Sequence, residues 1–150
     1  MLVNDWMSAP VITVSLEDNM QKAVELMTEN KIGMLPVVEQ GKLVGIVTNR
    51  DLKQAAPSSV SLIDVKQLLY HMARVKMGAI MTKNPVTVRP DFTLEEAAEV
   101  LLENNISGCP VLDYEQQLAG IITKNDIFRT LVSSSWVRKK GVQFGFLLED

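Results

Sequence analysis

The 150-residue sequence has a single cysteine, Cys109, and a single histidine, His71. One cysteine cannot form an internal disulfide, which fits a reducing compartment, and we expect a cytoplasmic location. Transition-metal sites draw most of their ligands from cysteine and histidine, so this composition leaves too few for such a site. We therefore expect neither a bound metal nor a catalytic cofactor.

Long apolar runs and a charge excess of one sign are missing as well. No stretch approaches the roughly 20 apolar residues that span a bilayer, and residues 1–10 lack the charged start and apolar core of a signal peptide. Charged residues make up 22% of the chain, the net charge is −3, and no basic face or arm is visible. The short basic run at residues 138–140 is interpreted as a solvated linker. We expect no membrane and no nucleic-acid partner.

The signatures of common nucleotide-dependent enzymes are also missing. The chain contains neither the P-loop pattern G-x-x-x-x-G-K-[ST] nor the dinucleotide pattern G-x-G-x-x-G. No nucleophile and base stand out as a catalytic pair, and Cys109, which has no base near it in the sequence, is interpreted as a small core residue. The sequence therefore favours a protein that is not an enzyme.

What the sequence does contain is an internal repeat. Residues 7–37 match residues 81–111 at an offset of 74, and residues 43–51 match residues 118–126 at an offset of 75, after a one-residue insertion in a turn. Because the identities keep their order over about 45 positions, we interpret the chain as a duplication, with copy one at 7–51 and copy two at 81–126. The matched pairs include Met7 with Met81, Ala23 with Ala97, Pro36 with Pro110, Gly45 with Gly120 and Asp51 with Asp126.

Each copy reads as strand, helix, strand, strand, helix. Short apolar β-branched runs predict the strands, and apolar residues at helical spacing predict the helices. Ser15 with Asp18, and Thr93 with Glu96, are expected to cap the first helix of each copy. The expected elements are, in copy one, a strand at 11–14, a helix at 15–30, strands at 35–39 and 43–48 and a helix from 49, and, in copy two, a strand at 86–88, a helix from 93, strands at 109–113 and 118–124 and a helix from 125.

These elements predict a mixed α/β (α+β) fold of two pseudo-symmetric β-α-β-β-α repeats. Apolar residues at helical spacing between Leu62 and Met72 predict an amphipathic connecting helix, with His71 on the surface. Each copy alone would leave one face of a small sheet uncovered, so we expect the repeats to pack through their sheets. We divide the chain into repeat 1 at 1–56, a connector at 57–74, repeat 2 at 75–135 and a tail at 136–150.

The motifs of the two copies resemble those of the CBS domain, a family that occurs as tandem pairs called Bateman modules. Each copy has an I-x₃-P-V segment followed by L-x-G-I-[IV]-T-x-x-D, and the resemblance covers residues 1 to about 135. The chain is more similar still to bacterial CBS–ACT proteins of the acetoin-utilisation AcuB type. The segment TNRDLKQAAPS at 48–58 suggests this, as does the tail GVQFGFLLED, which reads like the first strand of an ACT domain.

The resemblance implies a regulatory module rather than a catalyst. In the family the ligand is usually AMP, ADP, ATP or a related adenosyl compound, bound in a cleft between the two repeats. CBS pairs commonly form homodimers, so a homodimer is also implied, and the module would report to an ACT domain or to a separate regulated protein. A structural dimerisation module without any ligand is the alternative.

The resemblance also implies which residues would bind an adenosyl ligand. Asp51 and Asp126 match the position that accepts the ribose diol, because a carboxylate can accept two hydrogen bonds at once. The helix starts next to them would bind phosphate. The remaining candidates are Thr48, Arg50, Thr123 and Lys124 for the phosphates, the backbone of Thr13, Val14, Thr87 and Val88 for the base, and Ile32, Leu35, Pro36, Ile106, Cys109 and Pro110 for the apolar wall.

A purely structural interpretation of the same residues stays open. Thr-x-x-Asp at a helix start is close to a capping box, and duplication repeats structure as readily as function. The copies also differ, because Gly33-Met34 stands where copy two has Ser107-Gly108. Gly108 would let a ligand approach the backbone while Met34 would fill the space, so copy two is the favoured site.

Overall fold

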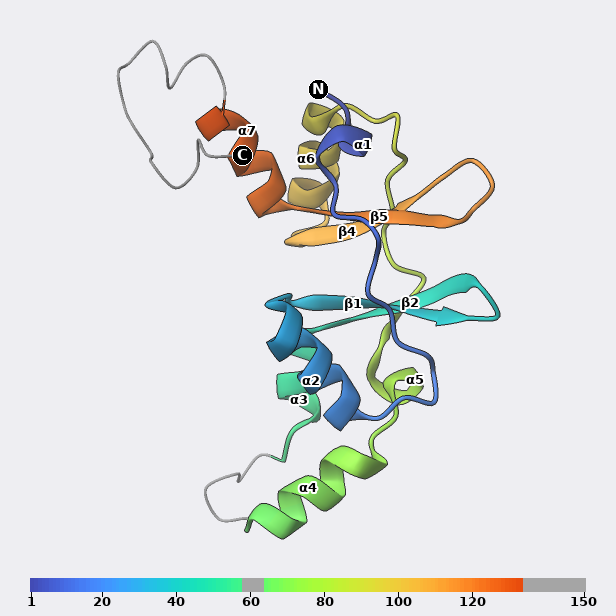
Figure 1. The fold of residues 1–150 in the computed structure, drawn as a ribbon, viewed down its shortest axis with the longest axis vertical. Helices are drawn as coiled ribbons and strands as arrows, with labels where there is room; N and C mark the ends of the chain where they lie inside the picture. Colours follow the sequence, from blue (N-terminus) through green and yellow to red (C-terminus); the bar gives the residue numbers. More distant parts are fainter. Residues whose placement is uncertain (58–63, 134–150) are drawn as a thin grey trace. The chain divides into compact units, whose positions relative to one another are not determined.

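The computed structural model describes residues 1–57 and 64–133 and has a mixed α+β fold with two compact units (Figure 1). Each unit contains a small antiparallel sheet, helices and a hydrophobic core of its own. The duplication in the sequence therefore corresponds to two similar structures. Among the described residues, the copy-one unit consists of residues 11–57, 64–85 and 116–118, and the copy-two unit consists of residues 1–10, 86–115 and 119–133.

The copy-one unit is built on an antiparallel sheet of β1 (Met34–Glu39), β2 (Lys42–Thr48) and β3 (Thr82–Lys83), in that order. Leu35 of β1 pairs with Val47 of β2, and both side chains are fully buried beneath helices that lie on one side of the hairpin (Figure 1). The hairpin turn has positive φ at Gln40 (49°) and Gly41 (78°), the geometry that suits the twist of two paired strands. Its elements are α2 (Met20–Asn30), β1 (Met34–Glu39), β2 (Lys42–Thr48), α3 (Asn49–Ala55), α4 (Val65–Arg74), α5 (Met77–Ile80) and β3 (Thr82–Lys83).

The copy-two unit repeats this plan around the hairpin β4-β5. Val111 of β4 and Ile122 of β5 are fully buried and join Ala97 and Leu101 of the covering helix in one core cluster. In each unit the expected first strand is reduced to one parallel bridge to the hairpin, Val14 to Val37 and Val88 to Val111. The elements are α1 (Val3–Trp6), α6 (Leu94–Glu103), β4 (Gly108–Leu112), β5 (Leu118–Thr123) and α7 (Lys124–Ser133).

The short helix that precedes each copy in the sequence packs on the core of the other copy. Val3 of α1 has no exposed surface, belongs to the copy-two core, and its N–H donates to the Phe92 carbonyl at 2.9 Å. Met77 of α5 is equally buried in the copy-one core, and its N–H donates to the Asp18 carbonyl at 2.8 Å. We call α1 and α5 the lead-in segments, because each precedes a copy in the sequence. The two lead-in segments are therefore exchanged between the repeats.

The residues after these short helices bind the edge of a hairpin at a glycine. A Cβ added to Gly45 would lie 2.5 Å from Met81 Sδ and 2.9 Å from the Thr82 carbonyl oxygen. At Gly120 the corresponding atoms are Met7 Sδ at 2.5 Å and the Ser8 carbonyl oxygen at 3.0 Å. Glycine is needed at both positions because a side chain would occupy the space of the incoming segment.

The helix caps agree with the sequence in copy two and differ in copy one. Thr93 caps α6 as expected, since Glu96 N–H donates to Thr93 Oγ1 at 3.1 Å and Thr93 N–H donates to the Glu96 carboxylate. In copy one the expected cap at Ser15 is wrong. Helix α2 begins at Met20, and Asn19 caps it by accepting the Lys22 N–H at 3.0 Å. The Ser15 N–H instead donates to Asp18 in a turn before the helix.

The connecting helix is present as α4, with Asp64 as its cap. His71 is half-buried rather than on the surface, and its Nε2 lies 2.8 Å from the Ala55 carbonyl oxygen. Leu62 and the tail at 136–150, with its resemblance to an ACT strand, lie outside the described residues. Within the described ranges, none of the helices has the length and apolar character needed to cross a membrane.

Candidate functional site

The Asp51 carboxylate is held at the start of α3 by a capping box. Thr48 donates to Asp51 Oδ2 from its N–H at 2.8 Å and from its hydroxyl at 3.1 Å, and Asp51 N–H donates back to Thr48 Oγ1 at 3.3 Å. The capping interpretation is therefore confirmed for this residue. In the structure the Thr48 hydroxyl donates to the Asp51 carboxylate, and its contact with a phosphate stays a prediction.

One oxygen of this carboxylate remains open. Among the described residues, none donates a hydrogen bond to Asp51 Oδ1. Asp51 is half-buried and lines an open hollow of about 220 Å³ together with Gln54, Ala55 and Ile80. The carboxylate is thus fixed through one oxygen and can accept hydrogen bonds from a ligand through the other.

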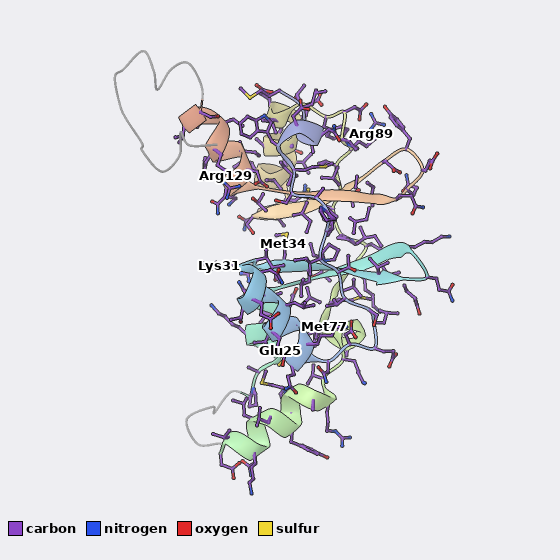
Figure 2. All side chains as sticks on the ribbon, in the orientation of Figure 1. Glu25, Lys31, Met34, Met77, Arg89 and Arg129 are labelled. Atoms are coloured by element: carbon purple, nitrogen blue, oxygen red, sulfur yellow. The ribbon has the colours of Figure 1, made fainter. Side chains whose placement is uncertain are left out.

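Asp126 makes the same capping bonds at the start of α7. Thr123 donates to Asp126 Oδ2 from its N–H and from its hydroxyl, each at 2.9 Å, and Asp126 N–H donates to Thr123 Oγ1 at 3.3 Å. The second oxygen is occupied here, because Arg129 Nη1 donates to Asp126 Oδ1 at 2.9 Å. Figure 2 labels Arg129 on α7. Both carboxylate oxygens of copy two therefore have a partner within the chain.

The helix starts are also tied to the loops that precede the first hairpin strands. Asn49 N–H donates to the Gly33 carbonyl at 3.0 Å, and Lys124 N–H donates to the Ser107 carbonyl at 2.9 Å. These first N–H groups of α3 and α7 are therefore used inside the protein rather than offered to an anion. The side chains of Arg50 and Lys124 are exposed and are the candidates left for a phosphate.

The segments expected to meet the adenine base are bound to the hairpins. Val14 N–H donates to the Pro36 carbonyl at 3.0 Å, and Val38 N–H donates to the Val14 carbonyl at 2.8 Å. Copy two repeats this arrangement, with Val88 N–H on the Pro110 carbonyl and Leu112 N–H on the Val88 carbonyl. The valine backbones are thus already paired, and the neighbouring Thr13 (exposed) and Thr87 (half-buried) are the residues of these segments that a base could meet.

The expected apolar walls divide into buried and accessible residues. Leu35 and Cys109 belong to the core clusters of their units, whereas Ile32 and Ile106 are half-buried and pack at the edge of those clusters. Cys109 is 1% exposed, which confirms its interpretation as a core residue, and this burial raises the pKa of its thiol to about 12. Met34 and Gly108 are the first residues of β1 and β4, and both are buried. Met34 pairs with Thr48 at the end of β2.

Gln54 and Arg129 are the residues that sequence reasoning missed. They occupy matching positions, three residues after Asp51 and Asp126. The signal was present, because this position on the same helix face carries a neutral residue in copy one and a cation in copy two. The repeated motif ends at the two aspartates, so the identities between the copies do not single out this position.

The two units share the same hairpin, parallel bridge and Thr–Asp cap, and a comparison with protein families matches both of them. The CBS domain model matches residues 3–58 and 77–133. The chain belongs to the CBS domain family. Two CBS domains follow one another in this chain, and the tandem pair inferred from the repeat is therefore confirmed.

Among known proteins, this CBS pair is similar to a CBS domain-containing protein of Dictyostelium discoideum. The two are 34% identical over 132 residues, which cover 87% of this chain and 91% of the relative. This CBS pair is also 39% identical over 118 residues to an inosine-5'-monophosphate dehydrogenase of Korarchaeum cryptofilum. That match covers 79% of this chain but 22% of the enzyme, so the CBS pair is only part of that protein.

Solved structures of CBS pairs have the same fold. The CBS domain pair of protein MJ0100, in complex with 5'-methylthioadenosine and S-adenosylmethionine, has a TM-score of 0.72 at 30% identity and covers 87% of this chain and 95% of that one. CBSX2, which is from Arabidopsis thaliana, has a TM-score of 0.70 at 30% identity in its complex with AMP, with 87% and 96% covered. Both neighbours bind an adenosyl compound.

Proposed function

We propose that this CBS pair is a non-catalytic regulatory module that binds an adenine nucleotide, namely AMP, ADP, ATP or a related adenosyl compound. The observation that carries the proposal is the Asp51 carboxylate, which is fixed by Thr48 through Oδ2 and open at Oδ1 beside a hollow. The adenosyl ligands of the two structural neighbours support it.

The chemistry of adenosine suits these residues. The ribose offers two hydroxyl donors, and Asp51 Oδ1 is a charged acceptor, which makes such hydrogen bonds short and strong. Since the carboxylate is already held in place, binding costs little ordering of the side chain. Arg50, the residue before Asp51 in α3, supplies charge for a phosphate, and Ile32 supplies apolar surface for the base.

A structural dimerisation module without ligand is the second candidate. Thr48 and Thr123 cap their helices through the aspartates whether or not a ligand is present, so helix capping alone accounts for the hydrogen bonds seen. Both functions predict a homodimer. Both also predict that the module acts on an ACT domain or on a separate regulated protein. What separates the two is the response to nucleotide.

A thermal-shift screen tests the proposal. AMP, ADP, ATP, S-adenosylmethionine and 5'-methylthioadenosine are each added at millimolar concentration. A ligand at a hundredfold excess over its Kd stabilises the folded protein by about 2.7 kcal/mol, which raises the Tm by roughly 5–10 °C for a chain of this size. Asp51→Asn, which keeps the shape of the side chain, reduces the shift. If none of these compounds raises the Tm, the dimerisation module is the better account.

A further inference from the structure

The two copies differ in what surrounds the second oxygen of the matched carboxylates. In copy two, Arg129 Nη1 lies 2.9 Å from Asp126 Oδ1, and the side chain of Asp126 is 4% exposed. In copy one the matching residue is Gln54, which is uncharged and makes no hydrogen bond with Asp51 in the described part of the chain. One acceptor is therefore open and the other is closed by a neighbouring cation.

We propose that Arg129 competes with ligand for the Asp126 carboxylate, so that copy one provides the stronger acceptor for a ribose diol and copy two the weaker. The proposal rests on the function proposed above. A diol donates two hydrogen bonds, and Asp126 Oδ2 already accepts two from Thr123, so a diol that binds Asp126 Oδ1 through both hydroxyls must displace the guanidinium. The apparent affinity then falls in proportion to the fraction of molecules in which the carboxylate is free.

The size of the competition follows from the exposure of the pair. The side chain of Arg129 is 63% exposed, so water screens its attraction to the carboxylate. Ion pairs of this kind shift an equilibrium by about fivefold at most. Arg129 therefore weakens copy two without abolishing it, and the two copies respond to different ranges of ligand concentration. This order of strength is opposite to the preference that Gly108 suggested.

The chain offers a matched pair of substitutions to test this. Arg129→Gln gives copy two the side chain of copy one, and Gln54→Arg does the reverse. Both positions are exposed, so both variants keep the fold. Arg129→Gln is measured in an Asp51→Asn background and Gln54→Arg in an Asp126→Asn background, which isolates one copy at a time. Calorimetric titrations use AMP and adenosine, because adenosine has the same diol without a phosphate.

We expect Arg129→Gln to tighten the binding of adenosine and of AMP by about fivefold. Gln54→Arg weakens adenosine binding by a similar factor. Should Asp126→Asn fail to fold, Gln54→Arg in the otherwise unaltered protein weakens the stronger of the two binding steps, which the same titration resolves.

Two results would overturn the proposal while leaving the proposed function intact. In one, Arg129→Gln leaves adenosine binding unchanged or weakens it. In the other, it weakens AMP binding alone, which assigns Arg129 to the phosphate instead of the carboxylate. If neither the unaltered protein nor any variant binds AMP or adenosine, the proposed function itself is wrong, and the competition falls with it.

Discussion

Gly45 and Gly120 hold the same place in the two copies because a methionine side chain and a backbone carbonyl fill the space where a Cβ would lie. The methionine can move to another rotamer, but the carbonyl belongs to a segment that is hydrogen-bonded to the hairpin, as in Ser8 N–H to the Ile121 carbonyl at 2.8 Å. At this scale the repeat in the sequence records packing that each copy needs in order to fold.

Gly120→Ala should lower the free energy of unfolding by about 1–3 kcal/mol, the usual cost of overpacking. Gly33→Ala is the control, because its Cβ would meet only the side-chain amide of Asn49, at 3.1 Å. Urea denaturation measures both. Equal losses in the two variants would contradict the close approach at Gly120.

Cys109 should resist thiol reagents in the folded protein. Its side chain is 1% exposed, and burial raises its pKa to about 12, so the reactive thiolate is scarce near pH 8. A chromogenic disulfide reagent should report no thiol until urea unfolds the chain, and then one per molecule. Rapid labelling without denaturant would show that the residue is accessible.

The same shift makes stability depend on pH. The unfolded thiol loses its proton near pH 9 and the folded thiol only near pH 12, so the free energy of unfolding falls as pH rises through this range. We expect the free energy of unfolding of Cys109→Ala to fall less over the same rise in pH. Urea titrations at pH 8 to 10 measure this for both proteins. Parallel pH profiles of the two proteins would remove Cys109 as the cause.

At the scale of elements, the sequence predicts the hairpins and most helices because their signals are local. The turn at Gln40-Gly41 and the capping box of Thr93 each lie within a few residues of the element they define. The start of α2 was missed because it depends on distant residues. Met20 N–H donates to the Val75 carbonyl at 2.8 Å, a contact that no local pattern around Ser15 reveals.

This correction gives a direct comparison of two caps. Asn19→Ala should cost about 1 kcal/mol, since it removes the acceptor for the Lys22 N–H. Ser15→Ala should change stability by less than about 0.5 kcal/mol, because Ser15 holds Asp18 mainly through its backbone N–H, which alanine keeps, and its side chain contributes least. Thermal denaturation of both variants measures the two losses of stability. A larger loss for Ser15→Ala than for Asn19→Ala would favour Ser15 as the cap of α2.

At the scale of the whole molecule, the exchange of lead-in segments could not be predicted from the repeat. The periodicity shows that α1 and α5 match each other, but it does not say which core each one covers. Burial of Val3 among copy-two residues and of Met77 among copy-one residues answers this. The candidate site was predicted as a set of residues, whereas the difference between Gln54 and Arg129 needed the hydrogen-bond geometry.

The exchange predicts that each lead-in residue protects the unit it packs in. Val3→Ala should cost about 1–3 kcal/mol and reduce amide hydrogen-exchange protection first in the copy-two unit, for example at Val111. Met77→Ala should reduce protection first in the copy-one unit, for example at Val37. If Val3→Ala loosened the copy-one amides first, the assignment of the segments would be wrong.

The proposed function depends on Asp51 accepting the ribose of an adenosyl ligand. A calorimetric titration of AMP into the unaltered protein and into Asp51→Asn tests it most directly. We predict saturable binding to the unaltered protein and a loss of roughly tenfold or more in the affinity of the stronger step for the variant, as expected when a charged acceptor is replaced by a neutral one. Identical titrations of the two folded proteins would contradict the claim.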